Sequence, residues 1–368
     1  MCQRRCLAAG PSHPEKLAKN ILIYRLGSLG DMGIAIPALR VIRRAFPTAH
    51  CTLLTNIPVS AKAAPAASVL DGQGLVDDYL AYPVGTRSPK RLLGLLTELR
   101  RNRYDLIVNL SAWRGVWPWR RDAIFFRLSG AGHYIGFKRE EGGPLRMGSD
   151  GRAEPEAARL LRRVATLGSA DLSDRQWFGL NFAPGERDAA RSLLASSGMA
   201  EPFMAVSVGT KVSANDWREA NWLALLERLA PECRGLGCVF IGSPDERERA
   251  DAYLCRWQGP ILNLCGTTSP RQSAAVLSLA RVFIGHDSGP MHLAAAAGTP
   301  CVAIFAARNP PGQWFPLGEG HHVLYHKTDC HGCGLDVCVE QQKKCILSIT
   351  VDEVASAVRD VLRDRLRH

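Results

Sequence analysis

The sequence predicts an α/β protein built from two Rossmann-like domains that face a central cleft. Short apolar runs alternate with amphipathic stretches, as in parallel sheets covered by helices, and the alternation restarts in mid-chain. A chain of 368 residues is long for one open α/β domain and comfortable for two. Glycine-containing turns follow two of the apolar runs, at the position where such folds bind ligands.

The two alternations define a first domain over 1–182 and a second over 183–368. In the first, the expected strands are 21–24, 51–54, 106–108 and 134–137. Helices are expected at 38–46, 90–103 and 154–167, with a loop at 140–151. In the second, the expected strands are 203–208, 238–241, 261–264, 282–284 and 301–305. The expected helices there are 219–229, 245–257, 272–280, 290–297 and 351–366.

The composition indicates a packed protein without a membrane span. Hydrophobic residues make up 46% of the chain and charged residues 22%. No apolar run reaches the roughly 18 residues of a spanning helix, and the apolar stretch at 7–9 is too short for a secretion signal. We therefore expect a cytoplasmic protein. The net charge of +11 indicates either a solvated arginine-rich surface or an acidic partner, such as nucleic acid, an anionic membrane or a phosphorylated glycolipid.

The first chemical motif is RLGSLGD at 25–31, directly after the first expected strand. Gly27 and Gly30 allow a tight turn and a close approach of the backbone. A helix is expected next, with Pro37 in its first turn. Asp31 then projects from the carboxyl edge of the sheet, where it either caps the helix or does acid–base chemistry. The chain has no Gly-x-Gly-x-x-Gly pattern, which argues against a dehydrogenase.

The second motif is DSGPMH at 287–292, after another expected strand. Pro290 opens a helix and Ser288 stands at its N-cap position. The free amides and the dipole of such a helix start form an anion site that suits a diphosphate. The alternative is a well-capped structural helix with a packed His292. The density of special residues on one turn favours binding.

These two motifs, with HLAAAAGTP at 292–300, resemble glycosyltransferase family 9, the ADP-heptose:lipopolysaccharide heptosyltransferases. The resemblance extends from about residue 20 to the C-terminus. It implies a GT-B fold and an inverting mechanism that needs no catalytic metal or other cofactor. It also implies transfer of a sugar, heptose from ADP-heptose above all, to a lipopolysaccharide core or a related envelope glycolipid.

The resemblance assigns roles to individual residues. Asp31 matches the acidic residue proposed as the general base, which would take the proton of the acceptor hydroxyl. Glu246 matches a position that holds the ribose of the donor, although it would also suit the first turn of a helix. The residues that match the donor diphosphate site are Asp287, Ser288, Gly289 and His292.

One family motif is altered. Family members often carry Lys-x-Trp-Pro after the first strand of the second domain, whereas here Asn215 and Arg218 flank Trp217 at the Lys and Pro positions. We therefore expect Thr210 and Lys211 to bind the donor, with Lys211 or Arg218 supplying the positive charge.

Four cysteines cluster near the C-terminus: Cys330, Cys333, Cys338 and Cys345, with His326 and His331 nearby. The spacing allows a structural zinc or an iron–sulfur cluster, but it favours reduced or locally paired cysteines.

Basic and aromatic residues interleave at 113–121. The stretch is either a half-buried helix start or an acceptor surface, with arginines for anionic groups and tryptophans for sugar rings or the bilayer interface. We expect the first domain to face an anionic glycolipid at the cytoplasmic face of the inner membrane, as a peripheral protein. The arginines expected there are Arg100, Arg101, Arg103, Arg114, Arg120 and Arg121.

Two other functions fit the sequence less well. A nucleotide-sugar 2-epimerase of the same fold would need additional acid–base carboxylates in the cleft, and no clear set is evident. A non-enzymatic basic protein that binds zinc and nucleic acid would need a motif that reads RNA or DNA, and none is recognisable. We therefore expect a nucleotide-sugar donor and a glycolipid acceptor as partners, and no nucleic acid.

Overall fold

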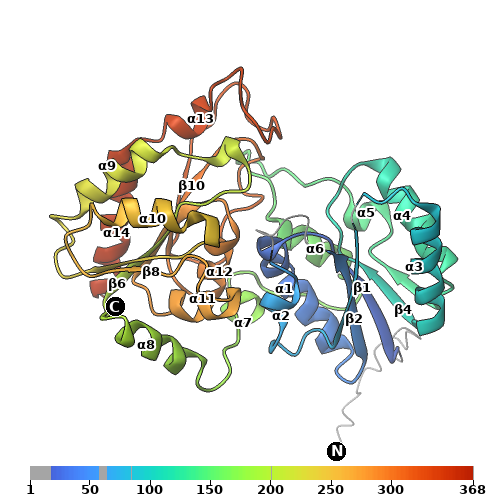
Figure 1. Ribbon diagram of the computed structural model, residues 1–368. Helices are drawn as coiled ribbons and strands as arrows, with labels where there is room; N and C mark the ends of the chain where they lie inside the picture. The colour runs from blue at the N-terminus through green and yellow to red at the C-terminus, as the bar shows by residue number, and fades with distance from the viewer. Residues whose placement is uncertain (1–17, 58–63, 84, 200, 368) are drawn as a thin grey trace, which may run out of the picture.

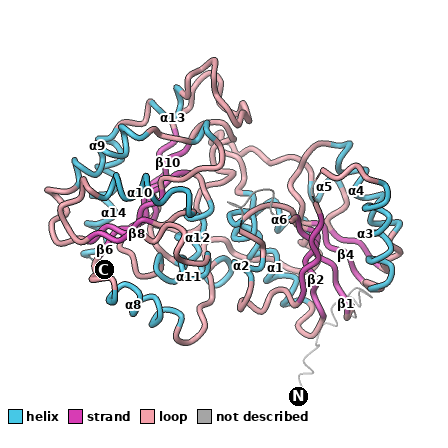
Figure 2. Tube along the Cα trace, in the orientation of Figure 1, coloured by secondary structure: helices cyan, strands magenta, loops and turns pink. Residues whose placement is uncertain are grey.

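Two parallel β-sheets organise the protein, seen in a computed structural model that describes residues 18–57, 64–83, 85–199 and 201–367 (Figure 1). Figure 2 shows the strands in two separate groups, each surrounded by helices. The apolar stretch at 7–9 lies outside the described residues. Within the described ranges, no helix combines the length and apolarity needed to cross a bilayer.

The first sheet has the order β3-β2-β1-β4-β5, with all neighbours parallel. Its strands are β1 (Asn20–Tyr24), β2 (His50–Asn56), β3 (Asp78–Tyr82), β4 (Leu106–Asn109) and β5 (His133–Ile135). The helices of this half are α1 (Leu29–Ala45), α2 (Ala67–Leu70), α3 (Pro89–Asn102), α4 (Val116–Leu128), α5 (Arg139–Gly142), α6 (Glu156–Arg163) and α7 (Arg175–Phe178). The strand order reverses between β1 and β4, which marks a ligand-binding switch point.

The second sheet has the order β11-β10-β9-β6-β7-β8 and is also parallel. Its strands are β6 (Phe203–Ser207), β7 (Gly237–Phe240), β8 (Ile261–Asn263), β9 (Val282–His286), β10 (Cys301–Phe305) and β11 (His322–Tyr325). The α-helices are α8 (Glu186–Ser196), α9 (Glu219–Leu229), α10 (Arg247–Leu254), α11 (Pro270–Leu277), α12 (Gly289–Ala297), α13 (Lys344–Leu347) and α14 (Val351–Arg367). Short 3₁₀ turns are η2 (Ser213–Asn215) and η3 (Pro244–Glu246). This is the six-stranded Rossmann order, with its reversal between β6 and β9.

The structure confirms two α/β halves and corrects several elements. Strands β3 and β11 were not predicted: both are half-exposed edge strands, and their short apolar runs at 79–82 and 323–325 are not buried as those of the central strands are. Helix α1 begins at Leu29 instead of residue 38, so Pro37 lies in the middle of the helix and not in its first turn. The one-turn helix α5 begins the stretch expected to be a loop. The boundary at residue 183 falls between α7 and α8 and stays a prediction.

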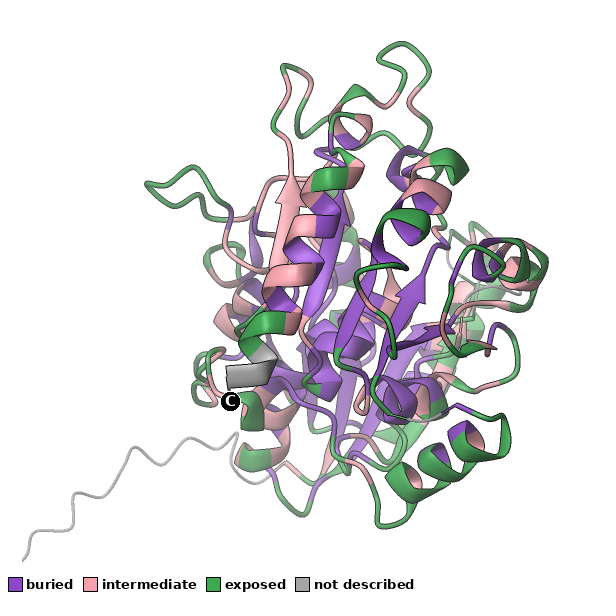
Figure 3. Ribbon diagram, turned by 90° about the vertical axis from the view of Figure 1, so that its left-hand side faces the viewer, coloured by how far each residue is buried: buried purple, intermediate pink, exposed green. Residues whose placement is uncertain are grey.

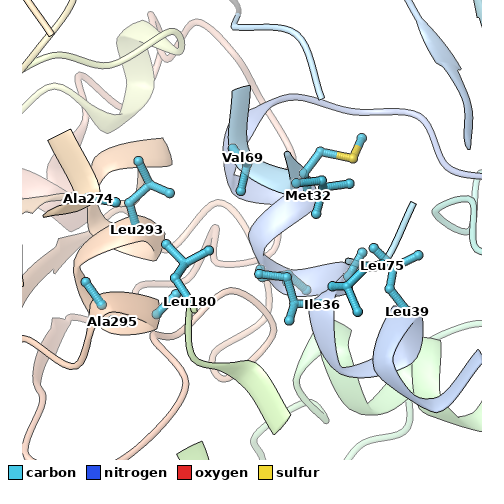
Figure 4. Packing of buried hydrophobic residues seen from close by; sticks show 14 of the residues in the cluster. Met32, Ile36, Leu39, Val69, Leu75, Leu180, Ala274, Leu293 and Ala295 are labelled. Atoms are coloured by element: carbon cyan, nitrogen blue, oxygen red, sulfur yellow. The ribbon is translucent and has the colours of Figure 1, made fainter. Parts of the chain in front are cut away.

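One apolar core runs through both halves of the molecule. Met32 and Ile36 of α1 belong to the same buried cluster as Leu293 of α12, and Leu180 of the connecting segment lies between these helices (Figure 4). This contact explains the early start of α1, since burial against α12 outweighs the low helix propensity of its glycines. In the second sheet, the central strands β6, β7, β9 and β10 are buried along their whole length (Figure 3). The switch points of the two sheets therefore lie on either side of the packed helices α1 and α12.

Helices α3 and α4 cover the far side of the first sheet. Leu99 of α3 and Phe126 of α4 are buried in a separate cluster with Leu22 and Ile107 of the sheet. The opposite sides of these two helices face outward, at the right of Figure 1.

Candidate functional site

A cavity of about 790 Å³ lies between the carboxyl edges of the two sheets. It is lined from the first half by residues that follow β1, and from the second half by residues that follow β6, β7 and β9. All the residues that the sequence predicts for catalysis or donor binding line this cavity: Asp31, Thr210, Lys211, Glu246, Asp287, Ser288, Gly289 and His292. The volume is that of a site for a ligand of several hundred daltons.

Asp31 stands in the first turn of α1 with its side chain 27% exposed. Its Oδ2 accepts a hydrogen bond from the backbone N–H of Ser28 at 2.8 Å and from the Ser28 hydroxyl at 3.3 Å. Its Oδ1 accepts from Arg25 Nη2 at 3.3 Å. The carboxylate therefore does cap the helix, as one interpretation expected, and still presents an accessible side to the cavity.

Behind Asp31 lies a buried charge network that the sequence did not reveal. Arg25 is fully buried, and its Nη1 donates to the Leu110 carbonyl at 2.9 Å and to Glu156 Oε1 at 3.4 Å. Glu156 in turn accepts from Arg159 Nε at 2.7 Å. Burial alone would raise the pKa of Glu156, but the hydrogen bond from Arg159 and the charges of Arg25 and Arg159 hold it below its usual value. Glu156 is thus an ionised group in the interior, and Arg25 bridges it to Asp31.

The start of α12 lines the same cavity from the second half of the molecule. Ser288 occupies the N-cap position and Pro290 the first turn, as predicted. The Ser288 hydroxyl is buried and has no hydrogen-bond partner within the described residues. With the free amides that follow, it offers donors to an anion at a positive helix end.

The starts of α1 and α12 touch each other at the cavity. A Cβ atom on Gly30 would lie only 2.8 Å from Cδ2 of His292, so glycine is required for this approach. His292 itself is 7% exposed, and its Nε2 lies 3.8 Å from Oδ1 of Asp287. The two sequence motifs, about 260 residues apart, are in direct contact in space.

Lys211 faces Asp31 from the other half of the molecule. Desolvation at the cavity wall lowers the pKa of Lys211, and the negative charge of Asp31 opposes that shift. Two further cations that the sequence analysis missed, Arg249 and Arg308, also line the cavity. A signal for Arg249 was present, because it follows Glu246 by three residues, about one turn, on the helix that comes after β7.

Lys211 lines the cavity and Arg218 does not, so of the two cations considered in place of the family's lysine the structure favours Lys211. Trp217 is fully buried, and its indole N–H donates to the Ile349 carbonyl at 2.8 Å. Asn215 does reach the cavity, and its Oδ1 is buried without a partner among the described residues. Trp217 therefore fixes the turn, and Thr210, Lys211 and Asn215 are its polar contributions to the site.

The carboxylate of Glu246 packs against Gly209, where a side chain would leave it no room. A Cβ atom on Gly209 would lie 2.0 Å from Oε1 of Glu246, so the carboxylate rests directly on the turn after β6. The Ser243 hydroxyl donates to the same oxygen at 2.6 Å. This arrangement fixes an acceptor for hydroxyl groups at the edge of the cavity.

The C-terminal cysteines are not assembled as a metal site. Across the described ranges, no group of three or more His, Cys, Asp or Glu side chains could hold a metal ion. His326 instead contacts the Ser348 hydroxyl at 2.9 Å and Glu353 at 3.0 Å. The structure therefore gives no support to the structural zinc considered for Cys330, Cys333, Cys338 and Cys345.

The predicted acceptor arginines lie outside the cavity. Arg114 and Arg121 form ion pairs with the nearly buried Asp122, at 2.6 and 2.7 Å. Arg100 donates to the Leu128 carbonyl, and Arg120 lies over the ring of Trp117. None of the six lines the cavity that contains Asp31.

Comparisons with known proteins agree with this geometry. Residues 92–344 match the family model of glycosyltransferase family 9 (heptosyltransferase). Lipopolysaccharide heptosyltransferase 3 of Escherichia coli is 25% identical over 290 residues, which cover 76% of this chain and 81% of that protein. The structure of a family 9 glycosyltransferase from Veillonella parvula DSM 2008 has a TM-score of 0.72 at 19% identity, over 94% of this chain and 98% of that one. The ADP-heptose lipopolysaccharide heptosyltransferase II of E. coli has a TM-score of 0.64 at 18% identity, over 94% and 99%. The fold is therefore GT-B.

Proposed function

Because this chain belongs to glycosyltransferase family 9, the heptosyltransferases, we propose that it transfers heptose from ADP-heptose to a lipopolysaccharide core with inversion of configuration. It is a glycosyltransferase by family. The donor, the acceptor, the stereochemistry and independence from metal are our proposals. So is its place, which we propose to be the cytoplasmic face of the inner membrane.

The observation that carries the proposal is that Asp31 of the first half and the α12 start of the second half line one cavity. In the reaction, Asp31 takes the proton of an acceptor hydroxyl as its oxygen bonds to the anomeric carbon of heptose. The bond from that carbon to the diphosphate breaks on the opposite side, and ADP leaves. A base and a leaving-group site that come from different halves and line one cavity suit such a displacement.

The second half supplies the groups that would stabilise ADP as it leaves. The amides at Gly289, the unpartnered hydroxyl of Ser288 and the ammonium of Lys211 can all face the diphosphate. Fixed donors and a cation of this kind perform the charge neutralisation that a divalent metal provides in other enzymes. Glu246 would accept from the vicinal hydroxyls of the ribose.

Family membership favours this function over the two alternatives raised by the sequence. An epimerase of the same fold and a basic nucleic-acid-binding protein are both outside the matched family.

The test is a transfer assay with lipopolysaccharide that lacks heptose. The protein is supplied with ADP-heptose, UDP-sugars or GDP-sugars in parallel, with and without EDTA. We expect ADP-heptose alone to be consumed, ADP to be released, EDTA to have no effect, and NMR of the product to show an inverted anomeric centre. Transfer from a UDP- or GDP-sugar, or retention at that centre, would overturn the corresponding part of the proposal.

A further inference from the structure

The outward side of α3 and α4 exposes an unusual set of apolar side chains. The described residues include ten exposed large hydrophobic side chains, and four of them lie on these two helices. Trp117 is 79% exposed, Leu93 62%, Ile124 60% and Leu128 52%. We call this surface, with the arginines beside it, the α3–α4 face. Exposed apolar side chains grouped on one surface usually mark an interaction site.

The group does not belong to the core. The inner sides of both helices already bury Leu99 and Phe126 against the sheet. The two helices are neighbours, because Arg100 Nε of α3 donates to the Leu128 carbonyl of α4 at 2.9 Å. The exposed side chains of both helices therefore share one outer surface.

On α4 the apolar residues form a stripe along the helix. Trp117, Ile124 and Leu128 follow one another at spacings that keep them on one side. Arg120 and Arg121 flank the stripe, and Arg120 lies 5.9 Å from the centre of the Trp117 ring. A tryptophan among arginines on an exposed helix is the combination that favours the interfacial zone of a bilayer.

The charge of this face is strongly positive. Helices α3 and α4 contain seven basic residues and two acidic ones. Of the two acids, Asp122 is only 9% exposed and is paired with Arg114 and Arg121. Glu98 lies five positions after Leu93, on another side of α3. The face thus combines apolar side chains with unneutralised positive charge, which complements an anionic lipid surface.

We propose that the α3–α4 face docks on an anionic lipid bilayer, with Trp117 and Ile124 entering the headgroup region. The inference rests on the proposed glycolipid acceptor and identifies where the protein meets the membrane that holds it. Helices α3 and α4 follow β3 and β4, so their first turns lie at the carboxyl edge of the sheet, as does Asp31. Docking there brings the bilayer to the same edge of the fold as the proposed base.

The experiment measures flotation of the full chain with vesicles of phosphatidylcholine, with or without phosphatidylglycerol, at low and high salt. The variants are Trp117→Ser with Ile124→Ser, and Arg120→Glu with Arg127→Glu. Matched controls are Ile261→Ser on the second half, where Ile261 is 47% exposed, and Arg187→Glu with Arg191→Glu on the exposed helix α8. Titration with ADP checks that each variant is folded.

We expect binding only to vesicles with phosphatidylglycerol, weakened by salt. Each basic residue near an anionic surface strengthens binding roughly fivefold, so reversing two should weaken it by at least about 25-fold. The Trp117/Ile124 variant should also lose most of its binding, while both controls float like the native protein.

Several outcomes would overturn the docking surface. The first is that the native protein does not float with the vesicles at low salt. The second is that the control variants lose as much vesicle binding as the test variants. The third is that the charge-reversal variant loses binding and the serine variant does not, which would make the attraction purely electrostatic. A concentration-dependent dimer that the serine variant disrupts would assign the face to a second copy instead. Vesicle binding without any heptose transfer would leave the docking surface standing and refute the proposed function.

Discussion

Arg25 donates to the Asp31 carboxylate at 3.3 Å from a position with no exposure to solvent, while Asp31 itself opens to the cavity. The same guanidinium reaches Glu156 at 3.4 Å. A carboxylate at the cavity wall is thus oriented by a buried cation, which is oriented in turn by a buried anion.

Replacement of Asp31 by Asn should abolish the base while keeping the shape of the side chain. Transfer should fall by roughly 10²–10⁴-fold, as for loss of a general base, and the affinity for ADP should stay within about twofold, because the proposed diphosphate contacts come from the second half and do not include Asp31. Steady-state kinetics and calorimetry measure the two quantities. Asp78→Asn, at a 68% exposed position in the same half, is the control. Near-native kcat in Asp31→Asn would refute the assignment.

Replacement of Glu156 by Gln should destabilise the fold. It removes the anion that Arg25 and Arg159 share, and breaking a buried ion pair costs about 3–5 kcal/mol. Urea unfolding measures this free energy, and exposed Glu140→Gln should change it by less than about 0.5 kcal/mol. An effect of Glu156→Gln as small as that of the control would contradict the network.

The same residue predicts a pH dependence of stability. The folded pKa of Glu156 lies below the unfolded value of about 4.3, so its ionised form stabilises the protein above that pH. This stabilisation is lost as the pH falls through the folded pKa. The free energy of unfolding should therefore fall more steeply in acid for the native protein than for Glu156→Gln. Parallel curves for the two proteins would show that Glu156 is not ionised in the fold.

Replacement of Lys211 by Ala should weaken use of the donor. A hydrogen bond to a charged group is worth about 1.5–3 kcal/mol, which corresponds to roughly 10–150-fold in kcat/KM for ADP-heptose. Arg218→Ala removes a cation from the same segment but outside the cavity and should leave kcat/KM unchanged. A larger loss in Arg218→Ala than in Lys211→Ala would reverse this assignment.

Replacement of Gly30 by Ala should force the starts of α1 and α12 apart. The new methyl group would meet His292 at 2.8 Å, and overpacking of this kind costs about 1–3 kcal/mol. Gly33→Ala, three residues along the same helix, meets nothing closer than 3.9 Å and should stabilise α1 by about 0.5–1 kcal/mol. Thermal unfolding and transfer assays distinguish them, and equal behaviour of the two variants would rule out a close approach at Gly30.

The structural features that could be predicted from the sequence are those that depend on short stretches of the chain. The central strands are continuous apolar runs, and both glycine-containing turns are local patterns, so the fold and the cavity residues on those turns were accessible, whereas Arg249 and Arg308 were missed. Edge strand β3 was not, because its short run at 79–82 mixes two tyrosines with Leu80 and Ala81 and lies half-exposed at the edge of the sheet. Nor was the partnership of Arg25 with Glu156, which are 131 residues apart. Long-range polar contacts leave no periodic signal in a single sequence.

The apolar layer that joins α1 to α12 affects how the molecule unfolds. Met32 and Ile36 on one side and Leu293 and Ala295 on the other belong to a single buried cluster, so neither half alone could cover its own apolar surface. Urea should therefore melt both halves in one cooperative transition, and a fragment containing only one sheet should aggregate. Relative movement of the halves is limited to sliding of packed helices, since a hinge-like separation would expose this layer to water.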